Sequence, residues 1–546
     1  MGTIYIDAAG GSTTNSGSTN NAAADVTLTI NAGEAFADAT LLVDVNTGAL
    51  TSIVTSGSTQ STIYFTNATN ANKKIFWISA YDNVSSPKTI TVDTIPTGLT
   101  AGTSTGTIGG QWKAPVNTGM STIDSASTLR PGDVVQFNDS PATSTQDFLT
   151  CRAAGTSAGR ITVKGKSGVR PVITVSNTTQ CIENNASNFA GWWFENLEMA
   201  QQGASGNVVF GMTATVFYNV KIGDGGGDGI SVGAGGNIII ASEITGLGAS
   251  AISTGTANAV TSGNYLHDVA TNGISEGGGN TVQTIDKNII DTCGGRGIQF
   301  TGSPSNLQGT RFISGNTIYG CGDSGIEVSN ASHVAILINN ILSENGNAAG
   351  EYNVEFVAGA AEIVSFHAWN VFYHSGGGGG SNLLNLTVNA QVASSEFTTD
   401  PQFTATGNKT FTSGDVNTTA ETITITAHGY TAGQVVMMTS TTGAVPTGVA
   451  LNTPYYVMVT DANTIQLSLT YASPAAINLT AAGSGTTTIH NGATANFAIG
   501  STSPAKAAGY PGAFLGGSTG YLDIGAVQRQ EAGGGGGPLI GGRLAI

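Results

Sequence analysis

The sequence predicts an all-β protein whose central part is a coiled parallel β-solenoid, and the first observation behind this prediction is a repeat. Between Trp192 and Ser375, dipeptides in which a polar residue precedes a strand-forming residue recur at separations of 23, 24, 21, 24, 28, 24 and 30 residues. They begin at Asn196, Asn219, Glu243, Asn264, Asn288, Asn316, Asn340 and Asn370. A second marker keeps the same phase from Gly229 to Asn353, with separations of 22, 22, 24, 28 and 28. A period in the twenties without helical periodicity is typical of solenoids of short strands.

The second observation is that proline is nearly absent from the repeat: Pro304 is the only one between Pro171 and Pro401. Central strands require this, because proline cannot donate a ladder hydrogen bond. The repeated asparagines are expected at turns that tolerate left-handed backbone, where stacked side chains would hydrogen-bond from coil to coil. Two cysteines also follow marker asparagines by five residues, which predicts stacking about 4.8 Å apart, as buried thiols or as a disulfide. The predicted structural ladder contains Asn196, Asn219, Asn264, Asn288, Asn316, Asn340, Cys293 and Cys321.

Composition and charge exclude several classes of protein. Charged residues make up only 10% of the chain and hydrophobic residues 40%, which favours ordered β-structure with tight turns over disorder. The net charge of −16 disfavours binding to nucleic acid. No apolar run approaches the roughly 20 residues of a membrane helix, so no membrane insertion is expected. Residues 1–7 lack the features of a signal peptide, and no cofactor motif is present.

The N-terminal part contains an expected insertion. Residues 3–21 read as one strand and a loop, and residues 25–94 alternate polar and apolar residues between turns, which predicts a small β-sandwich. The solenoid pattern begins near Ile108. The motifs PGDVV (131–135), GRITVKG (159–165) and GVRPVI (168–173) then resemble the opening of right-handed parallel β-helix proteins of the pectin-lyase-like superfamily. This resemblance implies a first strand or cap at 1–21, an inserted β-sandwich at 22–104 and the β-helix at 105–409.

A second insertion is predicted near the C-terminus. Asp400-Pro-Gln-Phe403 and two later segments, 496–509 and 523–527, resemble separated halves of a closing segment found in the same superfamily. Residues 410–491, which separate them, predict a second small antiparallel β-sandwich. Their motifs resemble β-modules that recur in bacteriophage tail and other virion proteins. Residues 492–530 are then the closing segment, and residues 531–546 are a Gly-rich linker with an apolar tail that we expect to dock on the solenoid or on a partner.

Titratable residues fall in the same turn of successive coils, which makes a loose stripe of acids and bases. Two stacked carboxylates could act as general acid and base in glycoside hydrolysis, since one or two coil steps match the required separation of about 5–9.5 Å. The alternative is that Asp and Asn are simply turn residues. The catalytic candidates are His267, Asp268, Asp291 and Glu344. Asp224 and Asp228 lie in a Gly-rich segment that could hold calcium, although a plain turn explains it as well.

Trp192 and Trp193 are neighbours in a predicted strand, so their side chains should point to opposite faces. One indole should therefore lie in the core. The other could stack on a sugar ring of a glycan or be covered by a neighbouring chain.

These observations favour a bacteriophage virion protein without enzymatic activity: a β-helical fibre, tailspike or decoration protein that attaches to host-surface glycan or stabilises the particle. Tailspike-like relatives imply a homotrimer that contacts other virion proteins, and no cofactor is expected. The first alternative is a polysaccharide depolymerase, either a hydrolase or a lyase. The second is a secreted or cell-surface bacterial adhesin.

Overall fold

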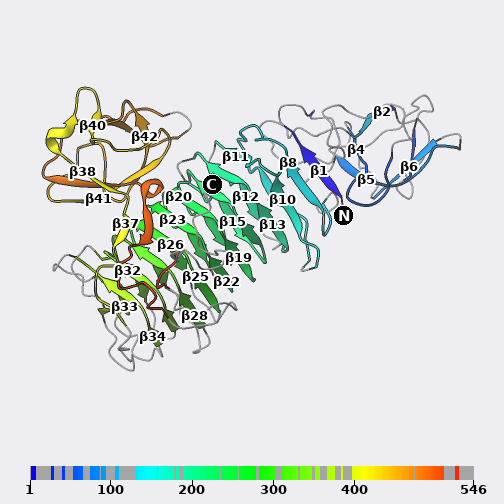
Figure 1. Cartoon of the computed structure of the whole chain (residues 1–546). Helices are drawn as coiled ribbons and strands as arrows, with labels where there is room; N and C mark the ends of the chain where they lie inside the picture. The colour runs from blue at the N-terminus through cyan, green and yellow to red at the C-terminus, as the bar shows by residue number, and fades with distance from the viewer. Residues whose placement is uncertain are drawn as a thin grey trace. The chain divides into compact units, whose positions relative to one another are not determined.

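The computed structural model divides into two compact units, residues 1–203 with 208–221, and residues 204–207 with 222–546. Its described residues are 2–7, 11, 26–29, 40–43, 53–65, 74–85, 88–93, 105–109, 129–156, 158–176, 180–184, 189–203, 205–233, 235–255, 258–277, 282–301, 309–329, 333–346, 351–356, 366–375, 383–384, 396–471, 474–509 and 523–527. The ordered elements among them are β-strands and short 3₁₀ helices, as Figure 1 shows. No helix of this part is long and apolar enough to cross a membrane. The predicted docking tail at 531–546 lies outside the described residues.

The first unit contains a parallel solenoid segment. One sheet has the order β1 (Thr3–Ile6), β8 (Val134–Phe137), β10 (Ile161–Gly165), β13 (Trp192–Glu195), β16 (Val216–Tyr218). A second pairs β11 (Val172–Val175) with β14 (Glu198–Gln201), and a third has the order β15 (Val209–Met212), β12 (Ile182–Asn184), β9 (Leu149–Cys151). β1 lies parallel to β8 with Thr3 opposite Val134, so the chain leaves the solenoid after one strand and returns much later.

The residues between these two strands form an antiparallel sheet, as the alternating pattern predicts. Its order is β2 (Val26–Thr29), β7 (Thr105–Ile108), β4 (Thr62–Phe65), β5 (Ile75–Asp82), β6 (Lys88–Val92), β3 (Thr40–Val43). Phe65, Phe76 and Trp77 are buried against it, and the Arg130 guanidinium lies 4.5 Å from the Trp77 ring centroid. Because β7 pairs with β2 and β4, residues 105–108 belong to this sheet. The β-helix boundary expected at residue 105 is therefore too early.

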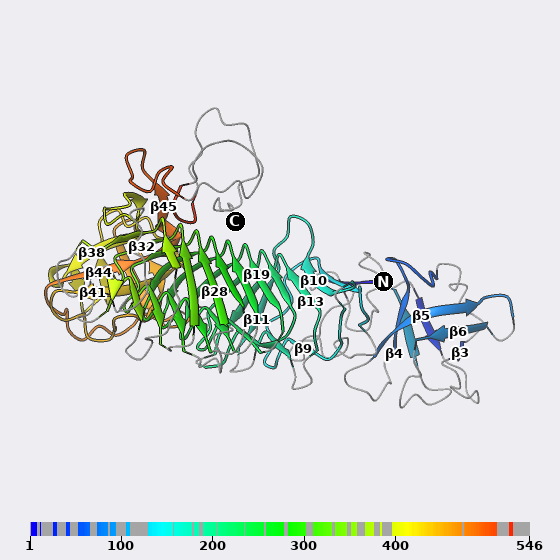
Figure 2. The same cartoon turned by 90° about the horizontal axis from the view of Figure 1, so that it is seen from below.

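The second unit contains three parallel sheets, and Figure 2 shows their strands following one another along one axis. The first has the order β19 (Asn237–Ile240), β22 (Ala259–Ser262), β25 (Gln283–Asp286), β28 (Gly309–Ser314), β31 (His333–Ile338), β34 (Phe366–Ala368). The second has β17 (Lys221–Gly223), β20 (Glu243–Leu247), β23 (Tyr265–Val269), β26 (Ile289–Cys293), β29 (Thr317–Tyr319), β32 (Ile341–Ser343), β35 (Val371–Tyr373). The third has β18 (Ile230–Val232), β21 (Ile252–Thr254), β24 (Ile274–Glu276), β27 (Ile298–Phe300), β30 (Ile326–Val328), β33 (Val354–Phe356), β36 (Leu383–Leu384).

Left-handed residues form the corners on both sides of the second sheet's strands. Before the strands, the corner residues with positive φ are Ala241, Gly263, Lys287, Gly315, Asn339 and Trp369. Inside or just after the strands, they are Asp224, Gly246, Asp268, Thr292, Gly320 and Glu344. A non-glycine residue at positive φ costs free energy. Its recurrence at the same place in each coil shows that these corners are a constraint of the solenoid.

A buried asparagine ladder runs along the first of these corners. The side-chain oxygen of each member accepts from the backbone N–H of the previous one, at 3.1 Å for Asn264 to Asn288 and 2.9 Å for Asn288 to Asn316. The same contacts continue to Asn340 and Asn370. Asn196 and Asn219 are not in this ladder. They are left-handed corner residues in the first unit, one position earlier relative to their strands. The asparagines of the sequence repeat therefore occupy two neighbouring positions of the coil, because Asn is suited both to a left-handed corner and to the ladder.

The solenoid core contains thiols and one ion pair. Cys293 and Cys321 are buried free thiols. The pKa of Cys293 is raised, first by burial and second by its hydrogen bond with Cys321. Arg311 and Glu276 also point into the core, where a guanidinium nitrogen lies 2.7 Å from a carboxylate oxygen and both side chains are at most 1% exposed.

A second antiparallel sheet forms the inserted domain at the C-terminal end of the chain. Its order is β38 (Asn408–Thr412), β44 (Thr486–His490), β41 (Val435–Thr441), β42 (Pro454–Val459), β43 (Thr464–Ser468), β40 (Thr422–Thr424), β39 (Val416–Asn417). One buried cluster, from Phe411 to Ile489, draws on most of these strands. In both antiparallel regions the described strands join into one sheet. The predicted all-β class, with antiparallel sheets outside the solenoid, is confirmed.

Short antiparallel strands close the base of the inserted domain. β37 (Phe403–Ala405) pairs with β45 (Asn496–Ile499), and 3₁₀ helices lie at Ser413–Asp415 and Gly492–Thr494. The closing segment then covers the outer face of the second sheet, where Ile499, Ala505 and Ile524 pack against Ile341 and Val371. The separated halves of the closing motif thus meet, with the inserted domain between them.

The core ion pair yields a stability prediction. Arg311→Met alone leaves a buried carboxylate without its partner and should cost about 3–5 kcal/mol of unfolding free energy. The double variant Glu276→Leu/Arg311→Met should recover most of the loss, as measured by urea-induced unfolding. Lys287→Met, at a partly exposed pair with Asp286, is the control and should cost less than about 1 kcal/mol. Equal losses in the single and double variants would contradict this assignment.

Candidate functional site

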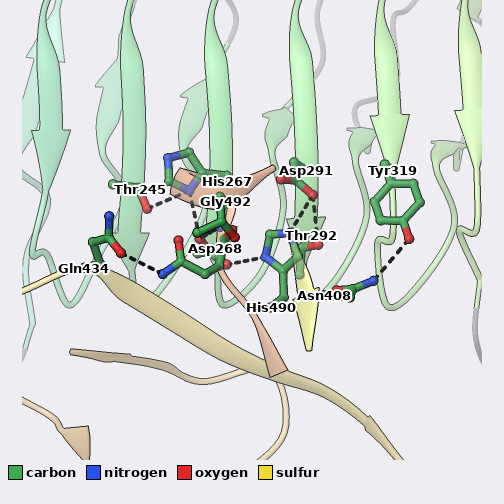
Figure 3. Close-up of polar contacts among 12 residues, drawn as sticks. Thr245, His267, Asp268, Asp291, Thr292, Tyr319, Asn408, Gln434, His490 and Gly492 are labelled. Atoms are coloured by element: carbon green, nitrogen blue, oxygen red, sulfur yellow. Dashed lines mark hydrogen bonds and ion pairs between the residues drawn. The ribbon is translucent and has the colours of Figure 1, made fainter. Parts of the chain in front are cut away.

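The structure buries three of the four predicted catalytic residues in a joint between the solenoid and the inserted domain. His267 and Asp291 point outward from β23 and β26, and Asp268 occupies the left-handed corner after His267. Figure 3 shows all three facing His490 and Gly492 of the inserted domain. His267 is 3% exposed and Asp268 and Asp291 are 0% exposed, so a substrate cannot reach them in this arrangement.

The Asp268 carboxylate is the centre of this joint. One oxygen lies 2.8 Å from Nδ1 of His490. The other lies 2.8 Å from Nδ1 of His267 and accepts the Gly492 backbone N–H at 3.0 Å. A buried carboxylate is stable only when its oxygens are bonded in this way.

Asp291 holds the other side of the His490 ring. Its Oδ1 lies 3.1 Å from Nε2 of His490, so the imidazole is placed between two carboxylates. The Tyr265 hydroxyl lies 2.9 Å from the second Asp291 oxygen and 2.7 Å from the Gly492 carbonyl. The Thr292 hydroxyl donates to Asp291 at 3.0 Å. The histidine thus bridges two coils of the solenoid to the inserted domain.

The electrostatics favour charged groups in this joint. Burial alone would lower the pKa of His490, but Asp291 and Asp268 more than offset it and raise the pKa to about 10. Burial likewise opposes the charge on His267, and Asp268 and Glu243 raise its pKa to about 9. Burial would raise the pKa of Asp268, but His490 and His267 lower it to about 2. These groups are imidazolium and carboxylate ions at neutral pH and act as a structural ion network.

The inserted domain follows the same corner along further coils. Asp224 accepts a hydrogen bond from the Tyr456 hydroxyl, whose pKa is raised by burial and by this carboxylate. The Asn452 side chain donates to the Gly294 carbonyl at 3.3 Å, and the Asn408 side chain donates to the Tyr319 hydroxyl at 3.2 Å. The corner that follows the second sheet's strands, together with the residues beside it, is therefore the surface on which the inserted domain packs.

The remaining predicted site residues lie apart from the joint. Glu344 follows β32, two strands beyond β26, and accepts from the Ser375 backbone N–H and hydroxyl. Asp228 accepts from the Ser250 backbone N–H. Within the described ranges there is no group of three His, Cys, Asp or Glu residues that could hold a metal ion. Asp224 and Asp228 both have hydrogen-bonding partners within the protein.

A separate polar surface lies on the outer face of the third sheet. In register, its outward residues on successive strands are Ser231, Ser253, Ser275, Gln299, Glu327 and Glu355. Arg296 forms ion pairs with Glu327 and with Asp323, the latter at 3.1 Å. In the sequence, this row could be recognised from the polar residue that follows each Ile or Val of the repeat running from Gly229 to Asn353.

Glu327 and Glu355 on this surface have opposite pKa shifts. Burial opposes ionisation of Glu327, but bonds from Ser329, Gln299 and Arg296 lower its pKa. Burial raises the pKa of Glu355, partly offset by the Ser324 hydroxyl, 2.7 Å away. Neighbouring carboxyl groups with opposite shifts are the usual arrangement of an acid and a base. However, Glu327 is only 5% exposed, which limits its contact with a substrate.

The two tryptophans divide between the faces of the strand, as alternation requires. Trp192 is fully buried, stacks on Phe194 at 5.9 Å and donates its indole N–H to the Ala153 carbonyl at 3.0 Å. Trp193 points outward, is half-buried, and lies edge-on to Tyr218 at a centroid distance of 6.4 Å. A glycan could therefore contact Trp193 but not Trp192.

Comparison with known proteins supports the solenoid. The family described as "Right handed beta helix region" matches residues 205–363. A search of curated proteins found no match. The chain is a right-handed parallel β-helix protein.

Several solved structures are similar at low identity. Pectate lyase Pel9A is 13% identical, with 74% of this chain and 89% of that chain covered and a TM-score of 0.34. The Dettilon tailspike protein (gp208) is 11% identical, with 66% and 84% covered and a TM-score of 0.31. An alginate lyase from Paenibacillus sp. str. FPU-7 is 16% identical, with 50% and 93% covered and a TM-score of 0.25. None of these likenesses carries an argument about activity.

The joint predicts a defined dependence of stability on pH. The pKa values of His490 and His267 are raised above 6.5, so their contribution is full below about pH 6.5 and is lost as the pH rises toward 10. The pKa of Asp268 is lowered below 3.8, so its contribution is present above about pH 4 and is lost as the pH falls toward 2. Thermal melting across pH should show the highest stability between about pH 4 and 6.5. His490→Gln should flatten the alkaline limb, whereas His428→Gln, inside the inserted domain, should not.

Gly492 provides a steric test of the same joint. A Cβ at this position would lie 2.3 Å from Nδ1 of His267, so Gly492→Ala should push the inserted domain away from the corner. We expect faster hydrogen exchange of the backbone amides at positions 294 and 492 and a loss of about 2 kcal/mol or more of unfolding free energy. Gly414→Ala is the control, because its Cβ would meet only the Thr412 hydroxyl, at 3.6 Å. Unchanged exchange in Gly492→Ala would show that the joint tolerates side chains and is looser than described.

Proposed function

We propose that this protein is a structural component of a bacteriophage particle: a β-helical fibre or spike that attaches to host-surface glycan or stabilises the particle, without cleaving the glycan. The observation that carries the proposal is the burial of His267, Asp268 and Asp291 in the joint. A general acid or base must come within hydrogen-bonding reach of its substrate, and these groups are instead bonded to the inserted domain. They give the fibre a rigid attachment point for that domain.

The inserted domain supports the assignment to a virion. Its sequence motifs resemble modules of bacteriophage tail and virion proteins, and it is held to several coils by Tyr456, Asn452, Asn408 and His490. Localisation in the virion and contact with other virion proteins follow from this proposal.

Incubation of purified protein with host cells and with isolated capsule or lipopolysaccharide tests the proposal. We expect binding in a pull-down and no release of reducing ends or unsaturated sugars. The variant Asp268→Asn should lose stability without changing this absence of product. Release of oligosaccharide that Asp268→Asn or Asp291→Asn abolishes at unchanged folding would overturn the proposal.

A second candidate function, a polysaccharide depolymerase, is favoured by the opposite pKa shifts of Glu327 and Glu355. In that case Glu355, with its raised pKa, would be the acid, and Glu327 would be the charged partner. If product is released, Glu355→Gln should reduce the rate by about 100-fold or more. Glu351→Gln, near the same Ser324 hydroxyl, is the control and should retain most activity.

Self-association is part of the proposal, with a homotrimer as the expected state. An apolar row runs along the outer face of the first sheet of the second unit and contains Ile238, Val260, Phe312 and Ile336, interrupted by Thr284. Val260 and Phe312 are 37% and 42% exposed. Such a row is a favourable surface for a second copy of the chain.

Light scattering after size exclusion tests this row. Phe312→Asp should shift a trimer toward monomer at unchanged melting temperature, because a charge would be buried at the interface. Leu469→Asp, at another exposed apolar residue in the inserted domain, is the control. A monomer at all concentrations in the unaltered protein would contradict self-association.

A further inference from the structure

The first coils contain a local excess of positive charge in an acidic protein. The net charge of the chain is −16, yet between Asp147 and Glu183 there are five Lys or Arg residues and no Asp or Glu. These five are Arg152, Arg160, Lys164, Lys166 and Arg170. Because the rest of the chain repels anions, this segment is a place where an anionic ligand meets a favourable potential.

Three of these cations lie around the outward aromatic pair of the first unit. Lys164 on β10 and Glu195 on β13 are register partners on the same outer face that carries Trp193. Tyr218 on β16 is the register partner of Glu195. Arg160 immediately precedes β10, and Figure 2 shows β10 and β13 side by side. Lys164, Trp193 and Tyr218 thus share one face of three consecutive strands.

The two arginines are held at opposite ends of these strands. The Arg160 guanidinium donates to the Ala214 carbonyl, near the start of β16. The Arg170 guanidinium donates to the Asn219 side-chain oxygen at 2.7 Å, just after the end of β16. In the part of the chain that the structure describes, Arg160, Lys164 and Arg170 form no ion pair with a carboxylate. Within the described ranges, no carboxylate neutralises these three charges by direct contact.

We propose that this face is a binding site for acidic saccharides, in which a sugar ring stacks on Trp193 and Tyr218. The carboxylates or phosphates of successive sugars are bound by Arg160 at one end of the strands, by Lys164 on the face itself and by Arg170 at the other end. The half-buried indole and the exposed phenol offer an apolar surface at low entropic cost. The cations supply charge-assisted hydrogen bonds to the anion. Glu195 is available to accept from sugar hydroxyl groups. The ligand class rests on the proposed attachment function, whereas the site is assigned by its own charge and geometry.

Affinity electrophoresis of the full chain in gels that contain one polysaccharide tests the site. The probes are polyglucuronate for carboxylate, phosphomannan for phosphate and dextran as the neutral polymer. We expect retardation by one or both acidic polymers, weakened by added salt, and little retardation by dextran. Retardation by only one acidic polymer identifies the anion that the site selects. Equal retardation by dextran would overturn the proposal.

Variants distinguish the face from the rest of the molecule. Lys164→Gln should weaken binding of the acidic polymer by about threefold, and the triple variant Arg160→Gln/Lys164→Gln/Arg170→Gln by about tenfold or more. Trp193→Ala should weaken it by about fivefold. The control variant Lys287→Gln/Tyr471→Ala removes one cation and one exposed aromatic ring from the second unit, outside the apolar row, and should bind normally. Melting temperatures verify folding, and Lys164→Gln remains informative if the triple variant is unstable.

Two further outcomes separate this inference from the proposed function. If the triple variant still binds host cells and acidic polymers as the unaltered protein does, the acidic-saccharide site is wrong and the attachment function stands. If the unaltered protein binds neither cells nor polymers, both fail. Duplex DNA is the competing polyanion: equal retardation by DNA that Trp193→Ala leaves unchanged would show a general polyanion surface and overturn the saccharide assignment.

Discussion

The constraint on which this structure depends is that every coil must return the backbone to the same register, one strand spacing further along. Parallel strands stack only if the corners between them repeat, and here the corners on both sides of the second sheet use left-handed residues. The ladder from Asn264 to Asn370 stabilises one of these corners from within, because each side chain satisfies a backbone N–H of the previous coil and so replaces water in the core.

The other corner determines how the inserted domain is attached. Two of the polar residues at this corner contact the inserted domain. Asp224 and Asp268 use this position to bind Tyr456 and His490. The same stacking that could align catalytic carboxylates therefore aligns anchoring groups. Whether such a row performs chemistry or docking depends on what covers it, and here a domain inserted more than a hundred residues later covers it.

Three of the catalytic candidates chosen from the sequence lie together in the structure, where they are buried beside the inserted domain. Counting placed His267, Asp268 and Asp291 in one turn of successive coils, and they do lie together. Their partner His490 was not identified, because nothing local relates residue 490 to residue 268. Glu355, which is the register partner of Glu327, was not identified, since outward strand positions carry no turn signal. Asn196 and Asn219 were assigned to the ladder because a one-residue shift is invisible when Asn suits both positions.

By itself, the sequence determined the repeat, the all-β class, the return of the chain to the solenoid after the first strand, and the opposite orientations of Trp192 and Trp193. The repeat, the class and the tryptophan orientations follow from periodicity and alternation, which are local properties of the chain. The return of the chain follows from the resemblance of its motifs to β-helix proteins. Only the tertiary structure decided which polar groups are buried and with whom, because burial depends on segments distant in sequence. The Asp268 carboxylate loses its water on burial. Its replacement partners are His267, which is adjacent in sequence, and His490 and the Gly492 backbone N–H, which are more than two hundred residues away.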